Sequence, residues 1–368
     1  MEQTQKKITI FMSFSGDGGV ERMMINLMQG LVANNYIVDL LLAKSRGSFV
    51  AMIPAQVNIV RLGTSHTYTS LLPLMRYLKN SRPPVLLVAK HRAGLVAAWA
   101  RRLTGIPEHL VLRLGTTVSA ALQGKSRSKH YIWHTTMRTF YPWVDKIIAV
   151  SQGVADDIIR ITGLSADRIK VIHNPVVTPE LASQARQPLS HPWFEPGSPT
   201  VIMGIGRLTY QKDFQTLIRA FARVRQQMPC RLVILGEGSE RTHYTSLATE
   251  LGITDSIDLP GFMANPYAYL GRAGLFVLSS RWEGSPNALT EAMALGIPVV
   301  ATDCPSGPRE ILQNGLIGRL VPIGDVEQLA EAMLDTIKHP PSTVELQAAV
   351  SSYTIETSTL KYLEVMNE

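Results

Sequence analysis

The stretch Arg281-Trp-Glu-Gly-Ser-Pro-Asn-Ala-Leu-Thr-Glu291 joins a short apolar run, Leu275-Phe-Val-Leu-Ser279, to a segment of helix-forming composition that ends near Gly296 and Pro298. The apolar run is typical of a buried strand, and the Gly and Pro are stop signals for a helix. The loop between them therefore leads into a helix N-terminus, where backbone amides of the first turn favour an anion. This strand–loop–helix unit predicts an α/β fold with a ligand site at the end of a strand.

Two carboxylates, Glu283 and Glu291, stand eight positions apart across the Gly-Ser-Pro turn. This spacing suits a nucleotide-sugar site, with one acid at the loop apex for sugar hydroxyls and one on the helix for a ribose diol. The amides from Asn287 to Leu289 are expected to be free donors in the first turn, because Pro286 cannot donate.

Positive charge for an anionic ligand is available after two other apolar runs. Arg207 and Lys212 follow the run that starts at Thr200, and they offer a planar fork and a mobile point charge, a pairing suited to a diphosphate. A further run from Arg231 ends in Gly236-Glu237-Gly238, where Glu237 either faces the diphosphate or turns outward. Three such strand ends indicate one cleft at the carboxyl edge of a parallel sheet.

The motifs Asn174-Pro175, Gly206-Arg207-Leu208 with Lys212, Gly236-Glu237-Gly238 and Glu283-x7-Glu291, in this order, resemble those of the retaining glycosyltransferases of family GT4. The resemblance covers nearly the whole chain and is sharpest between Val171 and Ile311. It implies an α/β fold of the GT-B type, with two Rossmann-like doubly wound domains facing a central cleft. The segment Ala301–Glu310 also resembles the form seen in members that use UDP-linked hexoses or N-acetylhexosamines.

The resemblance implies an acceptor-binding domain over residues 1–176, completed by a C-terminal helix at about 352–368, and a nucleotide-sugar-binding domain over residues 177–351. It implies that Arg207, Lys212 and Glu283 are catalytic, the first two neutralising the departing diphosphate and the third orienting the donor sugar. The implied donor-binding residues are Gly18, Gly19, Gly206, Glu237, Met263, Ser285, Asn287, Ala288, Leu289 and Glu291. Met263 is expected either near the base or as a core residue.

On the acceptor side this sequence departs from many relatives, which carry a His at the end of the strand corresponding to Leu110–Thr117. Here Arg113, Thr116 or Thr117 would replace it, or His91 would reach the cleft. The loop Gly16-Asp-Gly18-Gly19 lacks the dinucleotide pattern G-x-G-x-x-G, so an oxidoreductase loses its main support. Gly18 and Gly19 either approach the donor phosphates or form a plain strand-to-helix turn. Glu21 and Arg22 would touch the acceptor or cap the helix.

Size and composition agree with a two-domain chain without membrane spans. A chain of 368 residues exceeds the usual limit of a single core, and no apolar run approaches 18 residues. The segment Met1–Lys7 lacks a signal-peptide stretch, and Cys230 and Cys304 fit neither a metal site nor a disulfide framework. We therefore expect a cytoplasmic protein.

Charge divides the chain into two unlike halves. Residues 1–186 contain 23 Lys and Arg against 10 Asp and Glu, a net charge of +13, whereas residues 187–368 carry −6. Within 90–146, ten basic residues face two acidic ones, with Tyr131, Trp133, Phe140, Tyr141 and Trp143 interleaved. Such a segment predicts peripheral binding at the inner face of the cytoplasmic membrane; a solvated basic face is the alternative. Nucleic acid is not expected, because no motif for it accompanies the charge.

The resemblance thus implies a retaining transferase that moves a hexose or N-acetylhexosamine from a UDP-sugar to a lipid-linked, lipopolysaccharide or polysaccharide acceptor, with no cofactor besides the UDP-sugar co-substrate. Metal independence is expected because no D-x-D pair follows a strand, and Asp156-Asp157 is interpreted as surface charge on a helix. The alternatives are a sugar-nucleotide epimerase or hydrolase of the same fold and a non-catalytic nucleotide-sugar-binding protein.

Alternating patterns place further elements along the chain. Strands are expected at 8–14, 37–42, 85–89, 110–114, 146–150 and 169–172, a helix at about 20–33, and a proline-rich linker that breaks any helix at about 174–198. A second alternating series should run from 200 to about 338, followed by a terminal helix.

Overall fold

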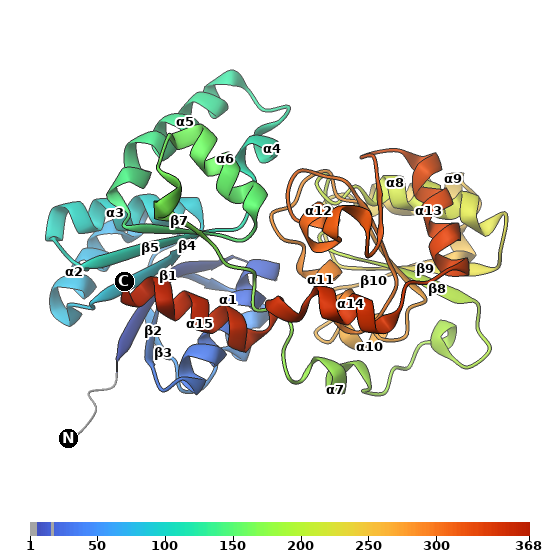
Figure 1. The fold of residues 1–368 in the computed structure, drawn as a ribbon, viewed down its shortest axis with the longest axis horizontal. Coiled ribbons are helices and arrows are strands. Elements are labelled where there is room, and N and C mark those ends of the chain that lie inside the picture. Colours follow the sequence, from blue (N-terminus) through green and yellow to red (C-terminus); the bar gives the residue numbers. More distant parts are fainter. Residues whose placement is uncertain (1–5, 16–17) are drawn as a thin grey trace. The chain divides into compact units, whose positions relative to one another are not determined.

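The computed structural model describes residues 6–15 and 18–368, so Gly16 and Asp17 of the glycine loop lie outside the described residues (Figure 1). The chain forms two compact units. Unit 1 contains the described residues up to Pro175 together with Thr354–Glu368, and unit 2 contains Val176–Tyr353.

Unit 1 is built on a seven-stranded parallel sheet in the order β3-β2-β1-β4-β5-β6-β7. Its strands are β1 (Lys7–Ser15), β2 (Ile37–Arg46), β3 (Asn58–Arg61), β4 (Val85–Ala89), β5 (His109–Leu114), β6 (Lys146–Ala149) and β7 (Ile169–Val171). Its α-helices are α1 (Gly19–Ala33), α2 (Leu71–Ser81), α3 (His91–Thr104), α4 (Val118–Leu122), α5 (Arg127–Phe140), α6 (Gln152–Thr162) and α15 (Ile355–Asn367). Short 3-10 turns are η1 (Ser48–Met52), η2 (Thr67–Ser70), η3 (Tyr141–Trp143) and η4 (Ala166–Arg168).

Both faces of this sheet are covered, because neighbouring residues of a strand enter opposite core layers. Phe11 and Val88 pack with the α2–α6 side, whereas Ile10 and Leu87 pack with α1 and α15. Strands buried on two faces read as continuous apolar runs rather than alternating ones. This is why the runs near 85–89 and 110–114 are visible in the sequence.

The C-terminal helix α15 lies along α1 in unit 1 (Figure 1). Gly30 allows the close approach, since a Cβ there would lie 2.0 Å from Thr359 Oγ1. Tyr362 is fully buried in the same layer. The predicted terminal helix is therefore present as an integral part of the core of unit 1.

Unit 2 is built on a six-stranded parallel sheet in the order β10-β9-β8-β11-β12-β13. Its strands are β8 (Thr200–Ile205), β9 (Cys230–Leu235), β10 (Ile257–Gly261), β11 (Leu275–Leu278), β12 (Val299–Thr302) and β13 (Arg319–Val321). Its α-helices are α7 (Leu181–Ala185), α8 (Phe214–Arg225), α9 (Arg241–Glu250), α10 (Tyr267–Leu270), α11 (Asn287–Ala294), α12 (Pro308–Ile311), α13 (Val326–Lys338) and α14 (Thr343–Ala349). The 3-10 turns are η5 (Pro192–Phe194), η6 (Thr254–Ser256), η7 (Gln313–Gly315) and η8 (Ser351–Tyr353).

Helices cover both faces of this second sheet as well. Buried residues of α8, α9 and α13 form one layer, and those of α10, α11, α12 and α14 form the other. The predicted fold class, α/β with two doubly wound parallel sheets, is confirmed.

The proline-rich segment differs from the expected linker. A short helix, α7, lies between Pro179 and Pro188, although the prolines were expected to break any helix. Arg272 fixes the segment by donating to the carbonyls of Ala185 and Gln187 at 2.9 and 3.0 Å. A proline ends a helix only where its own ring interrupts it, so five proline-free residues complete one turn and pack on unit 2.

Candidate functional site

The chemistry-bearing residues of unit 2 gather where its sheet changes winding direction. The helices that follow β8 and β11, α8 and α11, lie on opposite faces of the sheet. Between two such strands the loops diverge and leave a crevice at the carboxyl edge, which is where doubly wound sheets bind ligands. We call this point between β8 and β11 the unit 2 switch point.

A buried ion pair spans the unit 2 switch point. Lys212, in the loop after β8, places Nζ 2.5 Å from Oε1 of Glu283, in the loop after β11. Ser280 donates its hydroxyl to the same oxygen at 2.6 Å. The side chains of Lys212 and Glu283 are 18% and 9% exposed. The sequence thus predicted two site residues that the fold brings into direct contact.

Cys304 lies beside this pair, in the loop after β12. Burial raises the pKa of its thiol to about 12, and the negative charge of Glu283 adds to the effect. The thiol is therefore neutral near pH 7, and it fills space next to the carboxylate without competing for the lysine.

Glycines allow the loops after β8 and β9 to touch backbone to backbone. A Cβ on Gly236, whose φ is +138°, would lie 2.0 Å from the carbonyl oxygen of Gly206, and one on Gly238 would lie 2.2 Å from that of Leu208. The Lys212 stem crosses Gly206, where a Cβ would meet it at 3.0–3.2 Å. The Gly-Glu-Gly motif is thus required by packing that holds the first loop and its lysine in place.

Within the part of the chain that the structure describes, the Arg207 guanidinium differs from the Lys212 ammonium in having no hydrogen-bond or ion-pair partner. The Arg207 side chain is exposed. Nearby, buried Asp213 accepts from Arg281 at 3.0 Å and from the Thr216 hydroxyl at 2.9 Å. The guanidinium of Arg281 also lies 4.5 Å from the centre of the Tyr210 ring. The switch point therefore combines a fixed lysine with an arginine that is available to an anion.

Glu291 is held by a residue that the sequence did not single out. It is buried in α11, and Tyr267 of α10 donates its hydroxyl to Oε1 at 3.0 Å. Tyr267 is also buried, and its amide donates to the side-chain oxygen of Asn265 at 3.1 Å. A buried carboxylate requires hydrogen-bond donors. The expected burial of Glu291 is therefore the signal that could have pointed to a partner such as the Tyr267 hydroxyl.

The helix N-terminus at α11 is more occupied than predicted. The amide of Leu289, expected to be free, donates to the Pro286 carbonyl at 3.1 Å, and so does that of Thr290 at 3.3 Å. Tightening of the first turn to an i→i−3 contact explains the difference.

The remaining donor-side candidates of unit 2 lie on the same edge of its sheet. Ser285 is half-buried in the loop before α11. Glu237 is 54% exposed and forms a two-point contact with Arg241, at 2.9 and 2.7 Å, which lowers the pKa of the Glu237 carboxyl. Met263, after β10, is half-buried against the layer that contains α11. The predicted roles of all three in binding remain predictions.

In unit 1, the acceptor-side candidates are mostly interior. Arg113 is 2% exposed and donates to the side-chain oxygen of Asn174 at 2.7 Å. Thr117 is buried at the start of α4, whereas Thr116 is exposed. Asn26 donates to the Pro175 carbonyl at 2.8 Å. The Asn-Pro motif is thereby held to α1 and β5 at the point where the chain leaves unit 1 for unit 2.

His91 is also enclosed by side chains of unit 1. It is 8% exposed and stacks on Trp133 with the ring centres 4.3 Å apart. Nδ1 lies 2.9 Å from the Tyr141 hydroxyl, and Nε2 lies 3.3 Å from that of Thr136. Its predicted contact with the acceptor stays untested.

Protonation of His91 should destabilise the fold in acid. Burial, with Arg92 adding to the effect, lowers the pKa of His91 to about 4. The pKa of His91 in the unfolded chain is about 6.5. The contribution of neutral His91 to the free energy of unfolding is therefore complete above pH 6.5, and about 3 kcal/mol of it is lost as the pH falls toward 4. Urea unfolding at pH 7 and 4.5 should show this loss in the wild type and not in His91→Gln. The exposed His66→Gln is the control; an unchanged pH dependence in His91→Gln would refute the assignment.

One predicted surface charge is wrong. Asp157 of α6 is 3% exposed, forms an ion pair with Arg160 and accepts from the Ser119 amide at 3.0 Å. It lies on the inner side of an amphipathic helix, where it caps α4. Throughout residues 6–15 and 18–368, no group of three or more His, Cys, Asp or Glu side chains is arranged to hold a metal ion. Within the same residues, no helix is both long and apolar enough to cross a membrane.

Comparisons with known proteins match both units. A family model described as glycosyltransferase family 4 matches residues 17–179, and one described as glycosyl transferases group 1 matches residues 186–357. The chain is 26% identical over 342 residues, 89% of each chain, to N-acetylgalactosamine-N,N'-diacetylbacillosaminyl-diphospho-undecaprenol 4-alpha-N-acetylgalactosaminyltransferase of Campylobacter jejuni. It is 27% identical over 371 residues, 98% of each chain, to the lipopolysaccharide core biosynthesis glycosyltransferase LpsE of Rhizobium meliloti.

Among solved structures, the fold resembles Anabaena Alr3699/HepE in complex with UDP and glucose. The TM-score is 0.77 with 21% identity, over 99% of this chain and 100% of that chain. A likeness at this identity supports the fold, and it agrees with the predicted pair of Rossmann-like units.

Proposed function

Because the chain belongs to the family 4 glycosyltransferases, we propose that it transfers a sugar from a UDP-sugar to a lipid-linked, lipopolysaccharide or polysaccharide acceptor. The family assignment rests on the two glycosyltransferase models that match residues 17–179 and 186–357. The donor class is supported by the UDP and glucose held by the HepE structure. The acceptor class is supported by the names of the Campylobacter and Rhizobium relatives, which refer to a diphospho-undecaprenol-linked sugar and to lipopolysaccharide core biosynthesis.

The observation that carries this proposal is the charge arrangement at the unit 2 switch point. A fixed cation, Lys212, contacts the buried carboxylate of Glu283 at the carboxyl edge, and a second cation, Arg207, follows the same strand as Lys212 with a guanidinium that pairs with no other described residue. Cations there offset the charge of a diphosphate, and the carboxylate accepts hydrogen bonds from sugar hydroxyls. Glu291, oriented by Tyr267, would accept from the ribose hydroxyls.

The reaction is substitution at the anomeric carbon with retention of configuration. The acceptor hydroxyl attacks from the face that the diphosphate leaves; the new C–O bond forms as the bond to phosphate breaks, and the leaving phosphate oxygen takes the proton. The chain contributes positioning and charge stabilisation. The sugar is a hexose or N-acetylhexosamine, and Arg207 and Lys212 supply the positive charge without a divalent cation.

Two measurements test these finer points. Proton NMR of the product from an α-linked UDP-sugar should show an α-linkage, and a β-linkage would overturn retention. Activity should persist when EDTA is present in excess over any divalent ion, whereas abolition that added Mg²⁺ or Mn²⁺ reverses would overturn metal independence.

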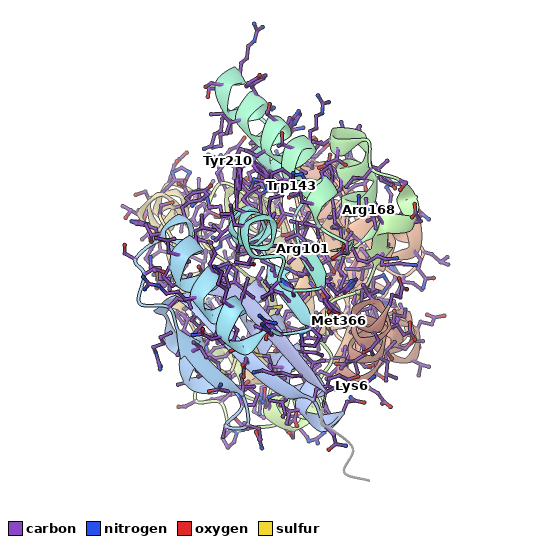
Figure 2. All side chains as sticks on the ribbon, turned by 90° about the vertical axis from the view of Figure 1, so that its left-hand side faces the viewer. Lys6, Arg101, Trp143, Arg168, Tyr210 and Met366 are labelled. Atoms are coloured by element: carbon purple, nitrogen blue, oxygen red, sulfur yellow. The ribbon has the colours of Figure 1, made fainter. Side chains whose placement is uncertain are left out.

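The proposal includes a cytoplasmic location at the inner face of the membrane, through the basic surface of unit 1. Tyr131 and Ile132 of α5 are 72% and 59% exposed beside exposed Lys129. Trp143 and Arg101 lie side by side (Figure 2), where Arg101 donates to the Trp143 carbonyl at 3.2 Å. Tyr141, by contrast, is buried and therefore cannot contact the membrane–water interface. Vesicles containing anionic lipid should co-sediment the protein more than neutral vesicles do; equal recovery would count against this surface.

The donor site is tested by thermal stabilisation with nucleotides and UDP-sugars. A ligand that binds the native state alone raises its stability by RT ln(1 + [L]/Kd), about 2.7 kcal/mol at 100 times Kd. UDP and one UDP-sugar should stabilise the wild type, and Glu291→Ala should reduce that shift. Glu331→Ala, an exposed acid on α13, is the matched control. Absence of a shift with every ligand would refute the proposed donor.

Tyr267→Phe should weaken UDP binding while the fold persists. The buried Glu291 carboxylate would lose the hydrogen bond that the Tyr267 hydroxyl donates at 3.0 Å. Removing one partner of a buried group costs about 1–3 kcal/mol, so the Kd for UDP should rise about tenfold. Isothermal titration measures the effect, with Tyr269→Phe on the same helix as the control. An unchanged Kd would show that the phenol does not orient Glu291 for the nucleotide.

A further inference from the structure

Unit 1 carries an ion pair across its own switch point. The helices that follow β1 and β4, α1 and α3, lie on opposite faces of the sheet, so the sheet changes winding direction between these strands. Lys90 directly follows β4, and Glu21 lies in the first turn of α1. Lys90 Nζ is 2.6 Å from Glu21 Oε1. Glu21 thus pairs with a lysine rather than capping its helix.

This arrangement repeats that of unit 2. In each unit a Lys–Glu pair joins the segments that follow the two strands at the switch point, at 2.6 Å in unit 1 and 2.5 Å in unit 2. In each, the carboxylate is the more buried partner: Glu21 and Glu283 are 5% and 9% exposed, whereas Lys90 and Lys212 are 35% and 18% exposed. Since the carboxyl edge at a switch point is where such sheets bind ligands, the first pair occupies a ligand-binding position too.

The backbone at Lys90 is held in an uncommon conformation. Its φ is +78°, a region that favours glycine and costs a lysine about 1–3 kcal/mol. Its amide donates to the Arg113 carbonyl at 3.2 Å, and Nζ also reaches the Ser13 carbonyl at 3.3 Å. Among the described residues, Glu21 and Ser13 are the partners recorded for Nζ, which has three donors. One N–H of a positioned ammonium is therefore directed to neither.

The local charge and space favour an anion. Lys90 and the buried Arg113, which interacts electrostatically with Glu21, together outweigh the single carboxylate. The backbone passes close to the Glu21 carboxylate at Gly18, where a Cβ would lie 2.8 Å from Glu21 Oε2. The absence of a side chain at Gly18 leaves room beside the Glu21 carboxylate that holds the ammonium.

We propose that unit 1 contains a phosphate-binding site at the β1/β4 switch point, in which Lys90 contacts a phosphate oxygen and Glu21 positions the lysine. This inference rests on the proposed function, because that function supplies two sources of the phosphate: the nucleotide diphosphate of the donor and the diphosphate of a lipid-linked acceptor.

The test is isothermal titration of the full chain with three probes: UDP, geranyl diphosphate and geraniol, which lacks phosphate. Lys90→Gln should weaken binding of one of the two diphosphates about 10- to 100-fold, as expected for loss of a charged hydrogen bond, and Lys90→Arg should restore most of it. Lys79→Gln, an exposed lysine at the end of α2, should leave both unchanged. If Lys90→Gln fails to fold because Glu21 is left unpaired, the double variant Glu21→Gln/Lys90→Gln removes both charges and should still lack the binding.

The outcomes separate the sources and the hypotheses. Loss confined to geranyl diphosphate assigns the site to the acceptor, and loss confined to UDP assigns it to the donor. The site would be overturned if Lys90→Gln left the affinity for both diphosphates unchanged. It would also be overturned if the wild type bound geranyl diphosphate no more tightly than geraniol and Lys90→Gln did not change the affinity for UDP. In that case UDP binding that still depends on Glu291 leaves the proposed function standing, whereas no UDP binding by the wild type would remove both.

Discussion

Lys212→Ala is expected to lower kcat by about 10²- to 10³-fold, the usual cost of removing one preorganised charge-stabilising donor. The lysine lies 2.5 Å from Glu283 at the unit 2 switch point, where it would neutralise the departing diphosphate. Initial rates of UDP release from the UDP-sugar that stabilises the protein measure the effect. Lys338→Ala, an exposed lysine at the end of α13, should retain the wild-type rate.

Lys212→Ala also removes the positive charge that compensates the buried Glu283 carboxylate. Glu283 keeps the Ser280 hydroxyl at 2.6 Å, so we expect a folded but less stable protein. Lys212→Arg preserves the charge and should recover part of kcat, which separates charge loss from a packing defect. A kcat for Lys212→Ala within about fivefold of the wild type, well short of the expected effect, would exclude the lysine from the chemistry.

Gly236→Ala is expected to destabilise unit 2 by about 3 kcal/mol or more, through backbone strain and overpacking. Its φ is +138°, and the new Cβ would lie 2.0 Å from the carbonyl oxygen of Gly206. Relief of the clash must displace the loop after β8, which carries Arg207 and Lys212. The variant should therefore also lose donor binding. Urea unfolding measures the stability loss.

Gly252→Ala provides the matched control for that substitution. Its φ is also positive, at +67°, but a Cβ there meets no atom within 4 Å. It should cost about 1–2 kcal/mol, the penalty of the left-handed conformation alone. Equal destabilisation by the two variants would show that the contact between the two glycine loops is not required.

Long apolar segments were predictable element by element. The helix expected at about 20–33 is α1, Gly19–Ala33, and the strand expected at 85–89 is β4, Val85–Ala89. The strand expected at 110–114 extends by one residue, to His109–Leu114. In each case a continuous or periodic apolar pattern is bounded by polar residues, Gly or Pro, so local sequence suffices.

Three of the short strands were not predicted. No specific strand was expected at β3 (Asn58–Arg61), β12 (Val299–Thr302) or β13 (Arg319–Val321). β3 and β13 contain polar or charged residues and have too few side chains to show a period, so their conformation depends on pairing with a neighbour. Arg319, for example, pairs in register with Val300 of β12. The equally short β6, β7 and β11 were predicted.

The sequence by itself determined the two-sheet architecture and which residue types stand at the strand ends, because apolar runs and the loops that follow them are local properties. Which side chains pair with one another was decided only by the tertiary structure. Lys212 and Glu283 are 71 residues apart, Tyr267 and Glu291 are 24 apart, and Lys90 and Glu21 are 69 apart. Buried charges must find compensating groups in space, and which groups lie within hydrogen-bond distance depends on strand order and helix placement, which no local pattern specifies.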